Sequence, residues 1–112
     1  MRTNEAAVLA ALADPTRRAV LEQVALGPVA VGELADRLPV SRPAVSQHLR
    51  VLTDAGLVSA RAAGTRRLYS LRREGLLVLR NWLDGLWQEA LTAFAAAVDE
   101  SDESDEPDEE KA

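Results

Sequence analysis

Two short amphipathic segments that follow each other almost without a gap constrain the fold of this chain most. Residues 31–38 and residues 42–52 each place their apolar side chains at helical spacing, so each is expected to be a helix with one face in a core. Ser41 is a favourable N-cap for the second helix, and Pro43 lies in its first turn, where no intrahelical hydrogen bond is lost. The sequence therefore predicts two helices that meet at a tight turn.

The outer face of the second helix has the side chains that a DNA groove would require. Val45, Leu49 and Leu52 form the apolar stripe, whereas the side chains on the opposite face are charged or hydrogen-bonding. An ordinary surface helix would also be polar outside, because it faces water. This alternative explains the periodicity of the helix and leaves its neighbours unexplained.

A predicted β-hairpin follows directly. Ala55 and Gly56 are expected to end the second helix, and residues 57–61 and 66–71 alternate in the manner of two strands joined through residues 63–65. The hairpin is rich in arginine. A pair of helices joined by a tight turn and followed by a basic hairpin is the order of a winged helix-turn-helix.

Several short motifs lie between Leu12 and Leu71: residues 12–18 (LADPTRR), 32–35 (GELA), 41–49 (SRPAVSQHL), Leu52, 55–58 (AGLV) and 64–69 (GTRRLY). On these motifs the run resembles the ArsR/SmtB (arsenic-repressor-like) family of small bacterial transcriptional repressors. The resemblance implies a homodimer that binds a two-fold symmetric operator, represses by blocking polymerase and commonly leaves the DNA when an effector binds.

Further helices are predicted before the pair of helices and after the hairpin. Residues 5–13 are alanine-rich and apolar on one face, which predicts a helix at the start of the chain. Another helix is expected to begin at Asp14 and Pro15 and to end at Gly27-Pro28. Residues 73–98 are expected to form the last helix. At residue 30, where a serine or threonine would complete a capping box with Glu33, the chain has alanine. The expected fold class is mainly α with a small β-hairpin, in the order ααααββα.

The last helix carries a wider apolar face than a winged helix of this size can cover alone. We therefore expect the chain to dimerise through its terminal helices. The expected interface residues are Val8, Leu12, Leu79, Trp82, Leu83, Leu86, Trp87, Leu91 and Phe94. An alternative for Trp82 and Trp87 is the lining of a small-molecule pocket, although large aromatic side chains on such a face are more often packing anchors.

The expected DNA contacts lie on the second helix of the pair and on the hairpin. They are Ser41, Arg42, Pro43, Ala44, Ser46, Gln47, His48 and Arg50, followed by Arg61, Thr65, Arg66 and Arg67. Gln47 is suited to adenine and Arg42 to guanine, while the hairpin residues would grip the backbone or the adjacent minor groove. For His48 we expect a phosphate or base-edge contact, with half-buried packing as the alternative.

The net charge of −5 divides unevenly along the chain. Residues 99–112 hold nine of the 18 carboxylates and one of the 13 basic residues, so the preceding part carries about +3. We expect residues 1–98 to form one DNA-binding and dimerisation domain and residues 99–112 to be an acidic disordered tail. The tail is either a solubilising appendage or a competitor of DNA for the basic surface.

Several function classes are disfavoured by what the sequence lacks. The absence of cysteine excludes thiolate metal sites, and the last helix offers only Glu74, Asp84 and Glu89 where relatives use histidines with carboxylates, so we expect no metal and no cofactor. There is no cysteine nucleophile and no glycine-rich phosphate loop, so we expect no enzyme. No apolar run approaches a membrane span and no signal peptide is recognisable, so we expect a cytoplasmic protein without a membrane partner.

The function that fits best is a sequence-specific DNA-binding transcriptional regulator, a homodimeric repressor of a palindromic operator without metal sensing. The alternative is a winged-helix protein-interaction module that has lost specific DNA binding, against which the basic hairpin argues. Control by an unknown effector and control by a protein partner both remain open.

Overall fold

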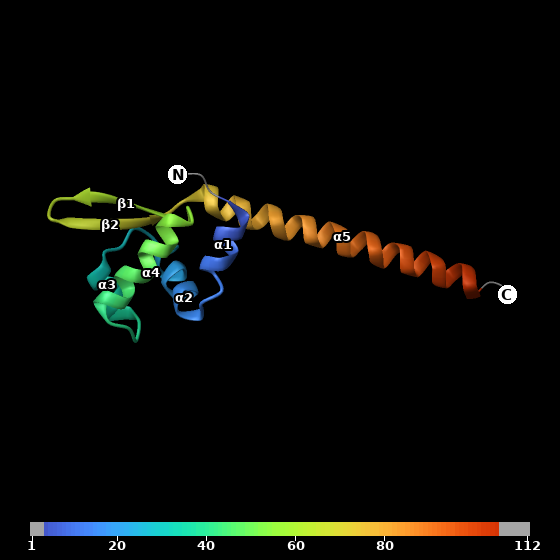
Figure 1. The fold of residues 1–112 in the computed structure, drawn as a ribbon, viewed down its shortest axis with the longest axis horizontal. Coiled ribbons are helices and arrows are strands. Elements are labelled where there is room, and N and C mark those ends of the chain that lie inside the picture. The colour runs from blue at the N-terminus through green and yellow to red at the C-terminus, as the bar shows by residue number, and fades with distance from the viewer. Residues whose placement is uncertain (1–3, 106–112) are drawn as a thin grey trace. The chain divides into compact units, whose positions relative to one another are not determined.

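The computed structural model describes residues 4–105, and it describes the side chains of this range through residue 100. The described residues fall into two compact units, which divide between Arg80 and Asn81 within the last helix. In chain order the elements are α1 (Glu5–Ala11), α2 (Pro15–Val24), α3 (Val31–Arg37), α4 (Arg42–Asp54), β1 (Val58–Ala63), β2 (Arg66–Leu71) and α5 (Arg73–Asp105) (Figure 1). The predicted order ααααββα is confirmed.

Side-chain N-caps begin the first two helices: Asp14 was predicted as a cap from the sequence, and Asn4 was not. Asn4 Oδ1 accepts the Ala7 amide at 2.8 Å, and Asp14 Oδ1 accepts the amides of Thr16 at 2.8 Å and Arg17 at 3.0 Å. These amides have no intrahelical partner, so each bond satisfies a donor that the helix leaves open. The Arg17 amide is the main reason that the pKa of the Asp14 carboxyl lies below its usual range.

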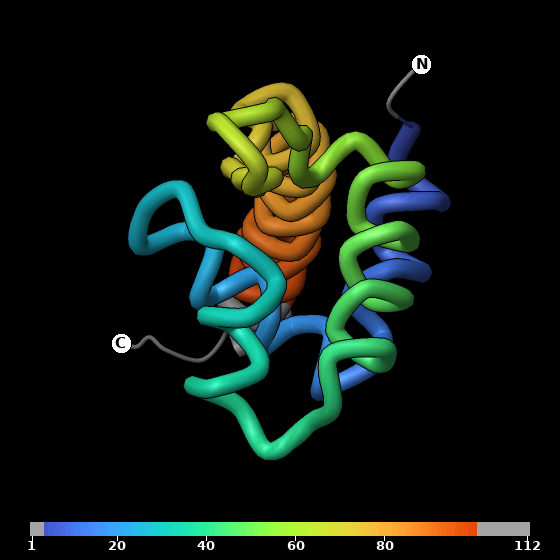
Figure 2. Tube along the Cα trace, turned by 90° about the vertical axis from the view of Figure 1, so that its left-hand side faces the viewer, coloured from blue at the N-terminus to red at the C-terminus, as the bar shows by residue number. Residues whose placement is uncertain are grey.

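The core of the first unit is built around α4, which contacts α1, α2, α3 and β1. Figure 2 shows α4 running alongside α1. Val45, Leu49 and Leu52 of α4 are completely buried, as their helical spacing predicted. The other core residues are Val8, Ala11, Val20, Leu21, Val24, Val29, Leu34, Ala55, Leu57 and Val58.

The burial of α1 corrects part of the expected dimer interface. Val8 is completely buried in the core of the first unit, so it offers no surface to a partner chain. Leu12 and Leu79 are partly buried and pack against the same core. The physical reason is that α4 already covers the apolar face of α1, which the sequence pattern alone assigned to a second copy.

The hairpin forms with a two-residue turn. Its antiparallel register runs from Val58 opposite Leu71 to Ala63 opposite Arg66, so the first strand begins one residue later and extends further than expected. Gly64 in the turn has φ +67°, a conformation that favours glycine. The amide of Val29 donates to the Tyr69 carbonyl at 3.0 Å and the amide of Tyr69 donates back at 2.8 Å, which ties β2 to the segment before α3.

The last helix is longer than predicted. α5 continues to Asp105, whereas its end was expected at Val98 and residues 99–105 were assigned to the disordered tail. The sequence between Val98 and Pro107 contains no glycine and no proline, so nothing in it stops the helix. The part of the predicted tail from residue 106 onward lies outside the described residues. No helix among the described residues is both long and apolar enough to cross a membrane.

The start of α5 is fixed to the first unit by a close backbone approach. A Cβ atom on the buried Gly75 would lie 2.9 Å from both the Gly56 carbonyl carbon and the Leu57 Cα. The Arg72 amide also donates to the Leu57 carbonyl at 2.8 Å. Only a residue without a side chain allows this approach.

We predict that Gly75→Ala lowers the free energy of unfolding by about 1–3 kcal/mol, because backbone atoms must shift to admit the methyl group. Gly85→Ala is the matched control on the same helix, since no atom that restricts a Cβ lies within 4 Å of that position. The control gains helix propensity of up to about 1 kcal/mol. Urea unfolding of the three proteins measures the difference, and equal stability of Gly75→Ala and the parent protein would contradict the packing argument.

Candidate nucleic-acid interface

The face of α4 opposite the core is polar and exposed. Ser46, Gln47 and Arg50 are exposed, while Val45, Leu49 and Leu52 are buried. An α-helix fits the major groove of B-DNA, and side chains of these types hydrogen-bond to base edges there. Because these predicted contacts are exposed, they are accessible to a DNA groove.

The beginning of α4 is set by local chemistry that the sequence predicted. Ser41 Oγ accepts the Ala44 amide at 3.3 Å, and Pro43 lies in the first turn. Ser41, Arg42 and Pro43 are exposed and Ala44 is partly buried. The first turn of α4 is therefore accessible at the end where amides and the helix dipole favour phosphate.

Arg42 does not extend freely from this turn. A Cβ atom on Gly32 would lie 2.8 Å from Nη2 and 3.1 Å from Cζ of Arg42, so the guanidinium rests against α3. The base-reading role of Arg42 remains a prediction.

His48 is half-buried, in agreement with the packing alternative. The contact of His48 with DNA stays a prediction.

The arginines of the hairpin lie on both of its faces. Side chains alternate along a strand, so the register places Arg61 and Arg66 on one face and Arg67 on the other. All three are exposed, as is Thr65 in the turn. The hairpin can therefore present positive charge to a phosphate backbone from either side.

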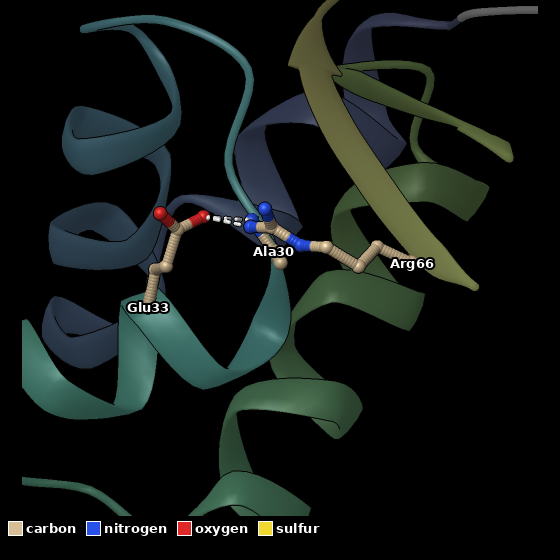
Figure 3. A network of polar contacts seen from close by, with 3 residues as sticks. All are labelled: Ala30, Glu33 and Arg66. Carbon is tan, nitrogen blue, oxygen red and sulfur yellow. Dashed lines mark hydrogen bonds and ion pairs between the residues drawn. The ribbon is translucent and has the colours of Figure 1, made fainter. Parts of the chain in front are cut away.

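One of these arginines is already paired. Arg66 Nη2 donates to Glu33 Oε1 at 2.7 Å, and the same oxygen accepts the Ala30 amide at 3.0 Å (Figure 3). The Ala30 amide is the main reason that the pKa of the Glu33 carboxyl is lowered, and Arg66 contributes to it. Glu33 supplies its half of a capping box at α3, although Ala30 has no side-chain oxygen to supply the other half.

Sequence reasoning missed this partner of Arg66. The position of Glu33 in the first turn of α3 signalled the bond to Ala30, but no local pattern links it to a strand 33 residues away. Around the pair lies an open hollow of about 340 Å³. Its lining residues are Ala30, Gly32, Glu33, Asp36, Arg42 and Arg66. The hollow brings together two predicted DNA contacts, one from α4 and one from β2.

The predicted interface residues of α5 in the second unit are mostly exposed. Trp82 is partly buried, and the large apolar side chains that follow it are exposed. They are Leu83, Leu86, Trp87, Leu91 and Phe94, with Val98 continuing the series. Contiguous exposed apolar surface of this kind is typical of an interaction site.

Within the described part of the chain, no group of three or more histidine, cysteine or acidic residues is arranged to hold a metal ion.

Comparison with known proteins identifies the family. A model described as a helix-turn-helix domain matches residues 12–60. The HTH-type transcriptional regulator Rv2034 of Mycobacterium tuberculosis is 62% identical over 89 residues, which are 80% of this chain and 83% of that protein. The transcriptional repressor SdpR of Bacillus subtilis is 34% identical over 76 residues, 68% of this chain and 84% of that protein. The chain belongs to the ArsR/SmtB family.

Solved structures agree with this assignment. An ArsR-like transcriptional regulator from Rhodococcus sp. RHA1 has a TM-score of 0.73 at 33% identity and covers 83% of this chain and 88% of its own. The homodimeric winged helix-turn-helix DNA-binding domain of Mb0332 from Mycobacterium bovis, a possible ArsR-family regulator, has a TM-score of 0.62 at 32% identity and covers 75% and 78%. This ArsR/SmtB family member is a winged helix-turn-helix transcriptional regulator that binds DNA.

We predict that Ser41→Ala lowers the free energy of unfolding by about 1 kcal/mol, because the Ala44 amide loses its acceptor at the start of α4. Ser41→Thr keeps a hydroxyl at the cap and is the matched control, with a smaller loss expected. Chemical unfolding monitored by circular dichroism measures both. A loss in Ser41→Thr as large as that in Ser41→Ala would show that the hydroxyl is not what stabilises this turn.

Proposed function

We propose that this regulator is a homodimeric repressor that binds a palindromic operator, with α4 in the major groove and the hairpin on the adjacent backbone. The observation that carries the proposal is the division of α4 into a buried apolar face and an exposed polar face, beside an arginine-bearing hairpin in the same unit. This is the arrangement in which a recognition helix reads bases while a wing holds the duplex.

The proposed contacts separate into two kinds. Ser46, Gln47 and Arg50 face the bases, where Gln47 has the amide geometry that pairs with adenine. Arg61, Thr65 and Arg67 contact the phosphate backbone, which orients the protein without reading sequence. Residues 1–98 carry about +3, so each protomer would release counter-ions on binding despite the acidic overall charge.

A homodimer is the assembly that fits both the protein and its proposed target. Two copies of α4 related by a two-fold axis match the two half-sites of a palindrome. We assign the interface to the exposed apolar residues of α5, with Trp87 and Phe94 as its large aromatic anchors. The homodimeric state of the Mb0332 domain supports the proposal of a dimer.

Repression follows from where such a dimer would bind, because a protein on promoter DNA excludes polymerase. The name of the relative SdpR, a transcriptional repressor, supports this direction of control. We leave metal sensing out of the proposal, since the chain has no cysteine and its one histidine, His48, lies on α4. A regulator of the chromosome acts in the cytoplasm, where we place this protein.

The proposal is tested by binding the full chain to its own upstream DNA, with a scrambled duplex as control and salt as the second variable. We expect a symmetric footprint, tight binding to the upstream duplex and a steep fall in affinity with salt. Equal weak binding to both duplexes would overturn operator recognition and favour a winged-helix protein-interaction module.

We predict that Gln47→Ala and Arg67→Ala have opposite signatures. Gln47→Ala should cost about 1–3 kcal/mol on the operator and relax the preference at one base pair, because it removes a base contact. Arg67→Ala should weaken binding to operator and scrambled duplex alike and lower the salt slope by about one, because it removes a phosphate contact. Binding isotherms on single-base operator variants measure both, and exchanged signatures would contradict the proposed docking.

We predict that Trp87→Ser weakens the dimer about 30-fold or more, corresponding to the loss of an interface anchor worth about 2 kcal/mol. Leu26→Ser is the matched control, because Leu26 is 77% exposed, lies in the loop after α2 and is not one of the assigned interface residues. Sedimentation equilibrium measures both. A dimer as stable in Trp87→Ser as in the control would place the interface elsewhere.

A further inference from the structure

The Glu33 carboxylate is held in place independently of Arg66. Its Oε1 accepts the Ala30 amide at 3.0 Å, and this bond caps the first turn of α3, where Ala30 itself provides no acceptor. A carboxylate fixed by the backbone needs no further ordering to receive a second donor. Arg66 finds it at 2.7 Å, with 55% of the arginine side chain and 47% of the glutamate side chain exposed.

The same pairing places a negative charge where the wing would meet DNA. Arg66 lies at the start of β2, beside the turn of the hairpin, and Glu33 and Asp36 line the hollow into which its guanidinium extends. A phosphate that approaches Arg66 therefore also approaches Glu33. Two anions at one guanidinium repel each other, so binding of phosphate favours release of the carboxylate.

We propose that Glu33 is an internal competitor of the DNA phosphate for Arg66. In the free protein Glu33 holds the arginine, and on DNA the arginine exchanges the carboxylate for a backbone phosphate. Because phosphate carries no sequence information, the exchange lowers the affinity for all duplexes by the same factor. This inference rests on the proposed binding of DNA through the hairpin and adds to it a residue on α3 that limits the affinity.

The size of the effect follows from the exposure of the pair. Half-exposed ion pairs are weak, and the measured range for such pairs corresponds to a change of about 1.4- to 5-fold in a binding constant. The competitor thus tunes the affinity without abolishing it. The proposal also predicts that the gain in DNA affinity on removing the Glu33 charge depends on the presence of Arg66.

Glu33→Gln tests the proposal with little disturbance of the fold. The glutamine keeps an oxygen that can accept the Ala30 amide, and it loses the charge that holds Arg66. Asp36→Asn is the matched control, because Asp36 lies on the same helix and lines the same hollow, whereas the carboxylate bonded to Arg66 is that of Glu33. Thermal unfolding checks that both variants fold as the parent does.

Binding of the full chain to the upstream and scrambled duplexes is then measured at one salt concentration. We expect Glu33→Gln to raise the affinity for both duplexes by up to about fivefold and to leave the ratio of the two affinities unchanged. Asp36→Asn should change both affinities less. In an Arg66→Ala background, Glu33→Gln should have only the effect of Asp36→Asn. This double-mutant cycle isolates the coupling between Glu33 and Arg66.

Three results with the Glu33→Gln variant would overturn the proposal. Weaker binding by Glu33→Gln would make Glu33 a residue that positions the wing for DNA, an effect no larger than that of Asp36→Asn would make it irrelevant, and a gain that persists without Arg66 would mean direct repulsion of DNA. Failure of operator recognition is detected separately, from the ratio of the parent protein's affinities for the upstream and the scrambled duplex. Absence of binding to any duplex would overturn both proposals.

Discussion

Burial of the apolar face of α4 is the constraint on which the rest of the first unit depends. Val45, Leu49 and Leu52 are completely buried, and α4 contacts α1, α2, α3 and β1. Because one face of the helix is committed to this core, its opposite face must point outward. The same packing that folds the unit therefore leaves Gln47 and Arg50 exposed, and no further element is needed to hold this face of α4 outward.

Features determined by neighbouring residues could be predicted from the sequence. Ser41 and Asp14 cap their helices because the acceptor and the open amides lie within three residues of each other. The spacing of apolar residues likewise identified the buried face of α4. The element order and the family resemblance followed from these local signals, and the comparisons agree with both.

Features determined by contacts across the fold could not be predicted. The pairing of Glu33 with Arg66 joins α3 to β2, and no periodicity connects them. Val8 looked like an interface residue because its helix is amphipathic, and only the tertiary arrangement shows that α4 uses that surface. The end of α5 was misplaced because acidic composition was taken as a sign of disorder, whereas the absence of a helix-breaking residue before Pro107 allows the helix to continue.

The bridge between Val29 and Tyr69 limits how the chain can vary in length. Both backbone groups of Val29 are bonded to β2, and Ala30, the next residue, is held by Glu33 at the start of α3. An inserted residue at this point would break the bridge or displace the cap. The exposed stretch at Leu26 lies just before it and has no such bonds to the hairpin. Insertions and deletions among relatives should therefore accumulate around residues 26–28, where a loop can grow without moving the wing.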